Sequence, residues 1–302
     1  MGIQPCDIVW LDGEFVGRRD AQVPVTTHAL HYGTSAFEGI RAYWTGDNLY
    51  IFRLYDHIRR LRRSGAFYQM TLHYTDEEMA DAIIGTCSKN NLKTNTYIRP
   101  LYFVGDWGIH LEIDAGAPTI SAVIVFPLEK LFDQDGLNVG ISSYRRLNDQ
   151  CMPIQAKVGG NYLNSITATM EAKTAGYDEA IMLDLHGNVS ETPGANIFLV
   201  QNGELITPDK ASSALDGITR DTIDFLASQE GIRTVYRRVA PSELYLSDEV
   251  FIVGTAAEVT PVKSVRGRDI SCGQITDRIK KIYTEAVTGR RPVPDGWLTP
   301  VY

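Results

Sequence analysis

Lys157 stands in a stretch of chain that could present its amine to a ligand. It follows the mainly apolar segment Met152-Pro153-Ile154-Gln155-Ala156 and precedes Val158, so no acidic side chain lies beside it in the sequence. Burial of the lysine stem without an acidic partner would favour the neutral, nucleophilic amine. The pattern therefore indicates a lysine that forms a covalent bond to a ligand, although a partly buried structural lysine would look the same at this stage.

The residues that follow Lys157 suit the same ligand. Gly159 and Gly160 would leave room for a planar group, and Asn161 can cap the helix expected after it. Tyr162 stands five positions after the lysine. We therefore expect Tyr162 to reach the same ligand.

An acid and two glycine turns supply the other groups that one cofactor needs. Pyridoxal 5'-phosphate (PLP) requires a lysine for its aldehyde, an anion beside its pyridinium nitrogen and a cup for its phosphate. Glu191 lies in a turn of small residues before an apolar strand and would be the anion. The segment Asp216-Gly217-Ile218-Thr219-Arg220-Asp221 would be the cup, because its glycine turn opens a helix whose first amides face an anion. Gly254-Thr255-Ala256-Ala257 is a second candidate cup.

Six blocks in the same order give the chain a resemblance to the class IV (fold type IV) PLP-dependent aminotransferases, and in particular to the branched-chain amino acid aminotransferases. The blocks are residues 31–41, 97–100, 157–165, Ser190-Glu191 with Gly194 and Asn196, 215–221, and 254–258. Together they span nearly the whole chain. A single block such as Gly-Ile-Thr-Arg would be a weak signal, because a glycine before a helix is common for structural reasons.

The resemblance implies a fold, an activity and partners. The fold would be α+β, the two-domain fold of D-amino acid aminotransferase-like PLP enzymes. The activity would be PLP-dependent transamination between branched-chain L-amino acids (leucine, isoleucine, valine) and 2-oxoglutarate. The partners would be these small molecules and further copies of the chain, in a homodimer or a larger homo-oligomer built from dimers.

The resemblance also assigns roles to single residues of the cofactor site. Lys157 would be the catalytic residue, Glu191 would keep the pyridine nitrogen protonated, and Tyr162 would bond the phenolic oxygen of PLP. The phosphate would be shared by four residues from separate parts of the chain: Arg60, Ile218, Thr219 and Thr255.

The candidate substrate-binding residues are predicted from the alternation of side chains along one strand and from the resemblance. Period-two alternation along a strand at 96–101 places Tyr97 and Arg99 on one face. In the family, such a tyrosine helps to bind the α-carboxylate beside the amides of Thr255 and Ala256, and the arginine receives the distal carboxylate of glutamate. The apolar pocket would be formed by Tyr32, Phe37 and Gly39, with Trp107 in a nearby loop. Core packing is an alternative role for Phe37 and Tyr32.

Other functions remain open. A transaminase of the same fold could act on D-amino acids or (R)-amines, although Tyr97-Ile98-Arg99 argues against it. An enzyme like aminodeoxychorismate lyase, or a protein that holds the cofactor without turnover, belongs to a different class. Lys157, Glu191 and Tyr162 together argue against an inactive binder.

The composition narrows the class of protein without identifying it. The chain has 302 residues and a net charge of -8, which argues against a nucleic-acid groove or an anionic membrane surface as a partner. Cys6, Cys87, Cys151 and Cys272 form no C-x-x-C, and the pair His28 and His31 lacks a third ligand, so we expect no metal and no disulfide framework. No apolar stretch approaches the roughly 18 residues of a membrane helix. We expect a cytoplasmic protein.

The expected elements give an α+β order with hairpins. We predict hairpins at 9–16, with an Asp12-Gly13 turn, and at 41–52. Helices are expected at 54–68, 75–90, 162–175, 219–229 and 273–287, the second with a capping box. Strands are expected at 96–104, 119–126, 137–143 and 250–253, and as a run of short strands over 179–206. The expected domains are a smaller one at 1–127 and a larger PLP-binding one at 137–302, joined by a loop at 128–136.

Overall fold

The chain folds into two compact units. The computed structural model describes residues 4–302 except 115, 133–135 and 272. The first unit holds residues 1–129, 156–160 and 287–302, and the second holds 130–155 and 161–286. Cys272 and part of the expected interdomain loop, Asp133 to Asp135, lie outside the described residues. The expected domain boundaries remain a prediction.

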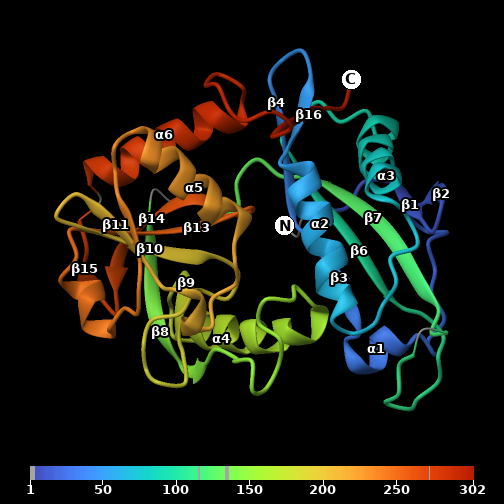
Figure 1. The fold of residues 1–302 in the computed structure, drawn as a ribbon, viewed down its shortest axis with the longest axis horizontal. Helices are drawn as coiled ribbons and strands as arrows, with labels where there is room; N and C mark the ends of the chain where they lie inside the picture. Colours follow the sequence, from blue (N-terminus) through green and yellow to red (C-terminus); the bar gives the residue numbers. More distant parts are fainter. Residues whose placement is uncertain (1–3, 115, 133–135, 272) are drawn as a thin grey trace. The chain divides into compact units, whose positions relative to one another are not determined.

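The first unit is built on an antiparallel sheet. Its order is β16-β5-β4-β6-β7-β1-β2, and β3 also pairs with β6 (Figure 1). The strands are β1 (Ile8–Leu11), β2 (Glu14–Gly17), β3 (Ser35–Phe37), β4 (Ile40–Trp44), β5 (Leu49–Phe52), β6 (Thr96–Val104), β7 (Thr119–Pro127) and β16 (Leu298–Pro300). The β1–β2 turn at Asp12-Gly13 has φ of 46° and 103°, which is the left-handed geometry that this dipeptide favours.

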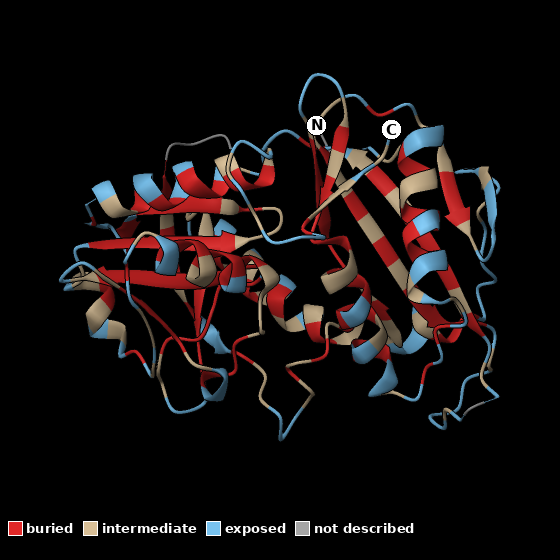
Figure 2. Ribbon diagram, turned by 45° about the horizontal axis from the view of Figure 1, so that its top comes forward, coloured by how far each residue is buried: buried red, intermediate tan, exposed pale blue. Residues whose placement is uncertain are grey.

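Two helices bury one face of this sheet. In α2 (Leu54–Ala66), Leu54, Ile58 and Leu61 recur at helical spacing and are fully buried. The helix α3 (Asp76–Lys89) begins with the expected capping box between Thr75 and Glu78. Figure 2 shows the buried residues along the strands and the exposed ones on the outer sides of the helices. Along β6, Tyr97 and Arg99 alternate with buried residues and are themselves only partly buried. A short helix, α1 (His28–Tyr32), precedes β3.

The second unit has a mixed sheet. Its order is β12-β11-β10-β13-β14-β8-β9, with β15 on β14, and its parallel pairs are β11–β12, β14–β8 and β8–β9. The strands are β8 (Leu137–Arg145), β9 (Glu179–Leu183), β10 (Asn196–Gln201), β11 (Glu204–Thr207), β12 (Thr234–Tyr236), β13 (Glu249–Gly254), β14 (Glu258–Val265) and β15 (Arg268–Asp269).

Helices of different composition cover this second sheet. The helix α4 (Tyr162–Thr174) packs Ala168 and Ala172 against Ala180 and Met182 of β9, so small side chains allow a close approach. The other two helices are α5 (Ile218–Gln229) and α6 (Gln274–Val287). The mixture of hairpins, parallel pairs and helices confirms the predicted α+β class.

Candidate functional site

Lys157 belongs to the sheet of the first unit. Its backbone oxygen accepts a hydrogen bond from the Phe37 amide of β3 at 3.1 Å, and its own amide donates to Ser64 Oγ of α2 at 3.0 Å. Three residues on, the Gly160 amide donates to the Gly33 oxygen at 3.1 Å. These bonds hold the segment against β3, and the Lys157 side chain is half-buried.

The two glycines after Lys157 serve this docking. A Cβ on Gly159 would lie 2.3 Å from Ser35 Oγ, and Gly33, which has φ of 69°, lies against the backbone of Gly160. The two glycines thus allow two backbone segments to approach each other. That they also leave room for a planar ligand stays a prediction.

Beside Lys157, the aromatic ring of Phe37 contacts two cations. The Lys157 Nζ lies over this ring at 5.0 Å from its centroid, and the Arg99 guanidinium carbon lies over it at 4.5 Å. Arg99 Nη2 donates to Tyr97 Oη at 3.0 Å, which confirms that Tyr97 and Arg99 share a face of β6. A Cβ on Gly39 would meet Tyr97 Oη at 2.0 Å, so only glycine leaves space for this tyrosine.

Arg60 lies in a buried network that the sequence did not reveal. Its Nε and Nη2 donate to the two oxygens of Glu38 at 2.6 and 2.8 Å, and His57 Nδ1 lies 2.8 Å from Glu38 Oε2. Burial alone would raise the pKa of Glu38, but Arg60 and then His57 hold it below its usual range. Burial, together with the positive charges of Arg60 and Lys157, lowers the pKa of His57. A neutral His57 therefore donates Nδ1–H to an ionised Glu38.

Tyr32 and Trp107 lie in two segments that contact each other. Tyr32 Oη donates to the Ile109 oxygen at 2.7 Å, and His28 Nε2 lies 2.9 Å from the His110 oxygen. Trp107 Nε1 donates to the Glu112 oxygen at 2.9 Å. Tyr32 is 41% exposed, so core packing does not account for it.

In the second unit, Glu191 is buried and held on both oxygens. Its Oε1 accepts from Arg146 Nε at 2.8 Å, and its Oε2 accepts from Asn196 Nδ2 and from the Leu215 amide, each at 3.1 Å. Its exposed fraction is 4%. A buried carboxylate with a guanidinium partner is an anion that can face a cationic ring nitrogen.

Asn196 joins the Glu191 turn to the start of α5. Its Nδ2 also donates to the Leu215 oxygen at 3.0 Å, and a Cβ on Gly217 would meet its Oδ1 at 2.0 Å. Gly217 is the N-cap of α5, so Ile218 and Thr219 are the first residues of that helix. Their amides have no acceptor within the helix and suit an anion.

Thr255 and Ala256 lie in the turn between β13 and β14. The preceding Gly254 packs against Gly194 and Ala195, where a Cβ would lie 3.3 Å from the Gly194 oxygen and 3.2 Å from the Ala195 Cβ. This contact brings the turn to the segment that carries Glu191 and Asn196. The second unit thus gathers Glu191, the start of α5 and this turn.

Tyr162 begins α4 and lies three residues before Ser165 on the same helix. Ser165 Oγ accepts from Arg146 Nη1 at 3.2 Å, so this face of α4 points towards the Arg146–Glu191 pair. The expectation that the Asn161 side chain caps α4 is wrong: a 3-10 turn precedes the helix, and Asn161 Nδ2 donates to the Pro153 oxygen at 3.0 Å.

Sequence reasoning missed three charged or titratable residues, Glu38, His57 and Arg146. Glu38 lies inside the block at 31–41 and His57 lies three residues before Arg60, but neither was assigned a role. Arg146 follows another arginine at the end of β8 and carries no motif. Its burial, at 6% exposure, distinguishes it from the exposed Arg145, and that difference is visible only in three dimensions.

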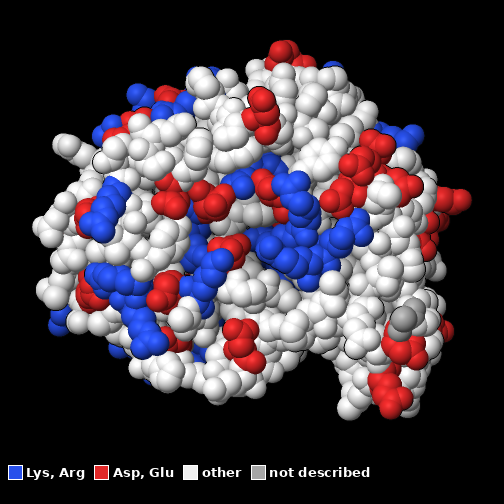
Figure 3. Space-filling model, in the orientation of Figure 1, with Lys and Arg blue, Asp and Glu red and all other residues white. Residues whose placement is uncertain are grey.

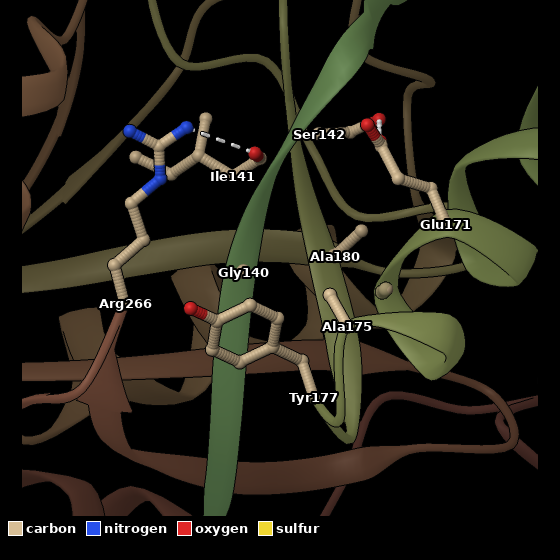
Figure 4. A pocket seen from close by; sticks show the side chains of 9 residues that line it. Gly140, Ile141, Ser142, Glu171, Ala175, Tyr177, Ala180 and Arg266 are labelled. Carbon is tan, nitrogen blue, oxygen red and sulfur yellow. Dashed lines mark hydrogen bonds between the residues drawn. The ribbon is translucent and has the colours of Figure 1, made fainter.

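Two cavities contain few or none of the predicted site residues. One of about 170 Å³ lies between β8, β9 and α4, where Glu171 accepts a hydrogen bond from Ser142 and Arg266 donates to the Ile141 oxygen at 3.1 Å (Figure 4). These two charged groups already bond to β8. The other, of about 420 Å³, is an apolar groove bordered by Leu30, Leu101 and Phe103.

Some charged residues form ion pairs. On the face in Figure 3, Lys and Arg gather in patches, and Asp and Glu lie both beside these patches and apart from them. One example is Asp216, which pairs with Lys210 at 2.7 Å and with Arg220 at 3.0 Å. Among the described residues, no cluster of His, Cys, Asp or Glu could hold a metal ion. No described helix is long and apolar enough to cross a membrane.

Comparison with known proteins defines the class. A family model described as amino-transferase class IV matches residues 35–265, which is more than half of the chain. The match spans β3 through β14 and includes Lys157 and Glu191. The chain therefore belongs to the class IV aminotransferases.

Relatives that match over the full length of the chain indicate which branch of the class IV aminotransferases it belongs to. The chain is 42% identical over 308 aligned positions to the branched-chain-amino-acid aminotransferase of Salmonella typhimurium, covering 100% of this chain and 99% of the relative. It is similar to the structure of the branched-chain aminotransferase of Thermoproteus uzoniensis with norvaline, at a TM-score of 0.96, 42% identity, and coverage of 98% of this chain and 100% of that one. The PLP-form enzyme of Thermobaculum terrenum gives a TM-score of 0.92 at 35% identity, with 99% of each chain covered. Within its family, the chain is a branched-chain aminotransferase.

Proposed function

We propose that this protein transfers amino groups between branched-chain L-amino acids and 2-oxoglutarate, with PLP as cofactor. The observation that carries the proposal is the arrangement around Phe37. An apolar ring that suits a branched side chain lies under both the Lys157 amine and the Arg99 guanidinium. Phe37 would thus offer an apolar surface to leucine, and Arg99 a cation to the distal carboxylate of glutamate.

The residues present fit PLP. The group requires a lysine amine, an anion for its ring nitrogen and donors for its phosphate, and when bound it supplies an electron sink for reactions at the substrate Cα. Lys157 would hold the aldehyde carbon and, once released, move a proton between the substrate Cα and the cofactor. Glu191 would face the ring nitrogen as a buried carboxylate. Tyr162 would donate to the phenolic oxygen.

The phosphate would be bound by the first turn of α5 and by two further side chains. Ile218 and Thr219 supply amides and a hydroxyl at a helix N-terminus, which is a favourable position for an anion. Thr255 supplies a hydroxyl from the β13–β14 turn. Arg60, whose guanidinium is oriented by its two hydrogen bonds to Glu38, would contribute its positive charge.

The substrate would be oriented by its carboxylates. Tyr97, with the amides of Thr255 and Ala256, would bind the α-carboxylate, and Arg99 would bind the distal carboxylate of the acceptor. Phe37, Gly39 and Tyr32 would line the side-chain pocket, and Trp107 would border it. The Tyr97–Arg99 pair supports substrates that carry a carboxylate over (R)-amines, which carry none.

Two experiments test the proposal. Borohydride reduction of the purified protein, followed by peptide mapping, should place a phosphopyridoxyl group on Lys157, and a label on another lysine would refute the assignment. A coupled glutamate assay with leucine, D-alanine and (R)-phenylethylamine as donors should show activity with leucine. A preference for either of the other two would support the alternative transaminases, and product formed without consumption of 2-oxoglutarate would support a lyase.

We further propose a homodimer in the cytoplasm. Support for the dimer comes from apolar side chains that the first unit leaves exposed in the two segments joined by Tyr32 and Ile109. Leu30, Ile109 and Leu111 are 64%, 75% and 80% exposed. Contiguous exposed apolar surface is typical of a protein interface.

A further inference from the structure

Arg146 is a buried cation that contacts Glu191 through Oε1. We propose that Arg146 is a positioning residue for Glu191 and keeps the shared proton on the pyridine nitrogen of PLP, away from the carboxylate. This inference rests on the proposed function of Glu191 as the partner of that nitrogen.

Arg146 is held both at its backbone and at its guanidinium. Its backbone amide donates to the Leu183 oxygen at 2.8 Å, directly after β8, so the start of the side chain is held by β9. Its Nε donates to Glu191 Oε1 at 2.8 Å and its Nη1 to Ser165 Oγ of α4 at 3.2 Å. Glu191 therefore has little freedom to turn away from its ligand.

Arg146 also differs from the other partners of Glu191 in its charge. Asn196 and the Leu215 amide donate to Oε2, but both are neutral. Arg146 is the cation that pairs with Glu191 among the described residues, and both side chains are almost fully buried, at 6% and 5% exposure. Water and salt screen a buried pair much less than an exposed one.

The position of Arg146 decides where a shared proton lies. A proton between Glu191 and the ring nitrogen can occupy either atom, and the total charge is the same in both cases. The guanidinium of Arg146 is in contact with the carboxylate of Glu191, so the ring nitrogen is farther from the guanidinium than the carboxylate is. Because Coulomb repulsion falls with distance, the proton is repelled more on the carboxylate than on the ring. Arg146 therefore favours the protonated ring, which is the form that withdraws electrons.

The test measures the protonation state of the ring nitrogen directly. The apoprotein is reconstituted with PLP that carries an NMR-active nitrogen isotope in its ring, and the nitrogen shift is recorded against pH. Arg146→Met should move the shift towards that of unprotonated pyridine and lower kcat about tenfold, the scale typical of groups that orient a catalytic ligand. The matched control Arg145→Met, at the exposed neighbouring arginine, should match the wild type in both.

Two further variants separate charge from structure. Arg146→Gln has a similar length and can still donate to Glu191, so it keeps a hydrogen bond and loses the charge. It should move the shift towards that of unprotonated pyridine, as expected for Arg146→Met, and it provides the test by itself if the methionine variant does not fold. Arg146→Lys restores the charge and should return the shift towards the wild-type value.

A parallel variant distinguishes failure of this inference from failure of the proposed function. If Glu191→Gln releases the ring proton while Arg146→Gln leaves the wild-type shift, the role of Arg146 is refuted and that of Glu191 stands. If neither variant changes the shift, Glu191 is not the partner of the ring nitrogen and both claims fail.

Discussion

At the scale of single residues, Arg99 carries its charge where water has limited access. Its Nε is buried and has no hydrogen-bond partner among the described residues, while its Nη2 bonds Tyr97. An anionic ligand could accept a hydrogen bond from this Nε. We therefore expect the distal carboxylate of glutamate to pair with it in a largely desolvated site.

Arg99→Ala should weaken the use of 2-oxoglutarate and glutamate far more than the use of leucine. The loss should be about 2 to 5 kcal/mol in kcat/KM for the dicarboxylates, since a buried charge pair is broken. Steady-state kinetics with each substrate, in both directions, measures the difference. Equal losses for leucine and glutamate would contradict the assignment of Arg99.

The Glu38–His57–Arg60 network should make stability depend on pH. The pKa of His57 is lowered in the folded protein, so the unfolded chain binds a proton below about pH 6.5 that the folded chain does not. Stability should therefore fall as the pH falls through that range. The lowered pKa of Glu38 adds a loss of the same sign below about pH 4.3.

The His57→Gln variant tests this expectation, because glutamine cannot take up the proton. Between pH 7.5 and roughly pH 5.5, the wild-type Tm should fall by at least about 2 °C more than that of the variant. His73→Gln, at an exposed histidine, is the control and should follow the wild type. Parallel Tm curves for all three proteins would rule out a contribution from His57.

At the scale of elements, strong local signals predicted structure well. The strand expected at 96–104 is observed as β6 with the same bounds, and the capping box at Thr75 begins α3. The five-residue α1 and the strand β16 were missed. The first is too short to show a helical period, and the second is held by pairing with β5, which is distant in the sequence.

The candidate site could be predicted as a set of residues but not as a set of contacts. Lys157 and Glu191 stood out because their neighbours in the sequence are informative. Arg146 and Glu38 act through side chains more than twenty positions away in the sequence or on another element, and no local pattern encodes such a pair. The contacts of the glycines after Lys157 with Gly33 and Ser35 could not be predicted, because these partners lie in a distant segment of the sequence.

Gly33→Ala should disturb the segment that carries Lys157. An added Cβ would lie 3.1 Å from the Gly160 Cα, and φ of 69° strains any residue with a side chain. Gly176→Ala is a matched control, because Gly176 has φ of 80° but nothing within 4 Å of an added Cβ. Both variants should lose about 1 to 2 kcal/mol from the strain.

Only Gly33→Ala should also weaken PLP binding. The measurement is cofactor occupancy by absorbance after dialysis, alongside urea unfolding for stability. If the two variants retain PLP equally, the contact between Gly33 and Gly160 has no role in presenting Lys157.

At the scale of the whole molecule, the exposed apolar side chains near Tyr32 predict self-association. Leu111→Asp places a charge in the proposed interface and should convert a dimer into monomers, because a charge buried there would lack a partner. Leu246→Asp, at a leucine of the second unit that is 73% exposed, should leave the dimer intact. Sedimentation velocity at assay concentrations measures both. A wild-type protein that is fully active as a monomer would exclude the interface.

The path of the chain through its two units has a consequence for biosynthesis. The first unit is completed by residues 156–160 and 287–302, and β16 of the last segment pairs with β5. During translation, the first sheet therefore gains its lysine-bearing segment only after the second unit has begun to emerge from the ribosome. It gains its outermost strand last of all. Neither unit corresponds to one continuous stretch of the reading frame, and splitting the coding sequence at any single point would divide the first unit between the two fragments.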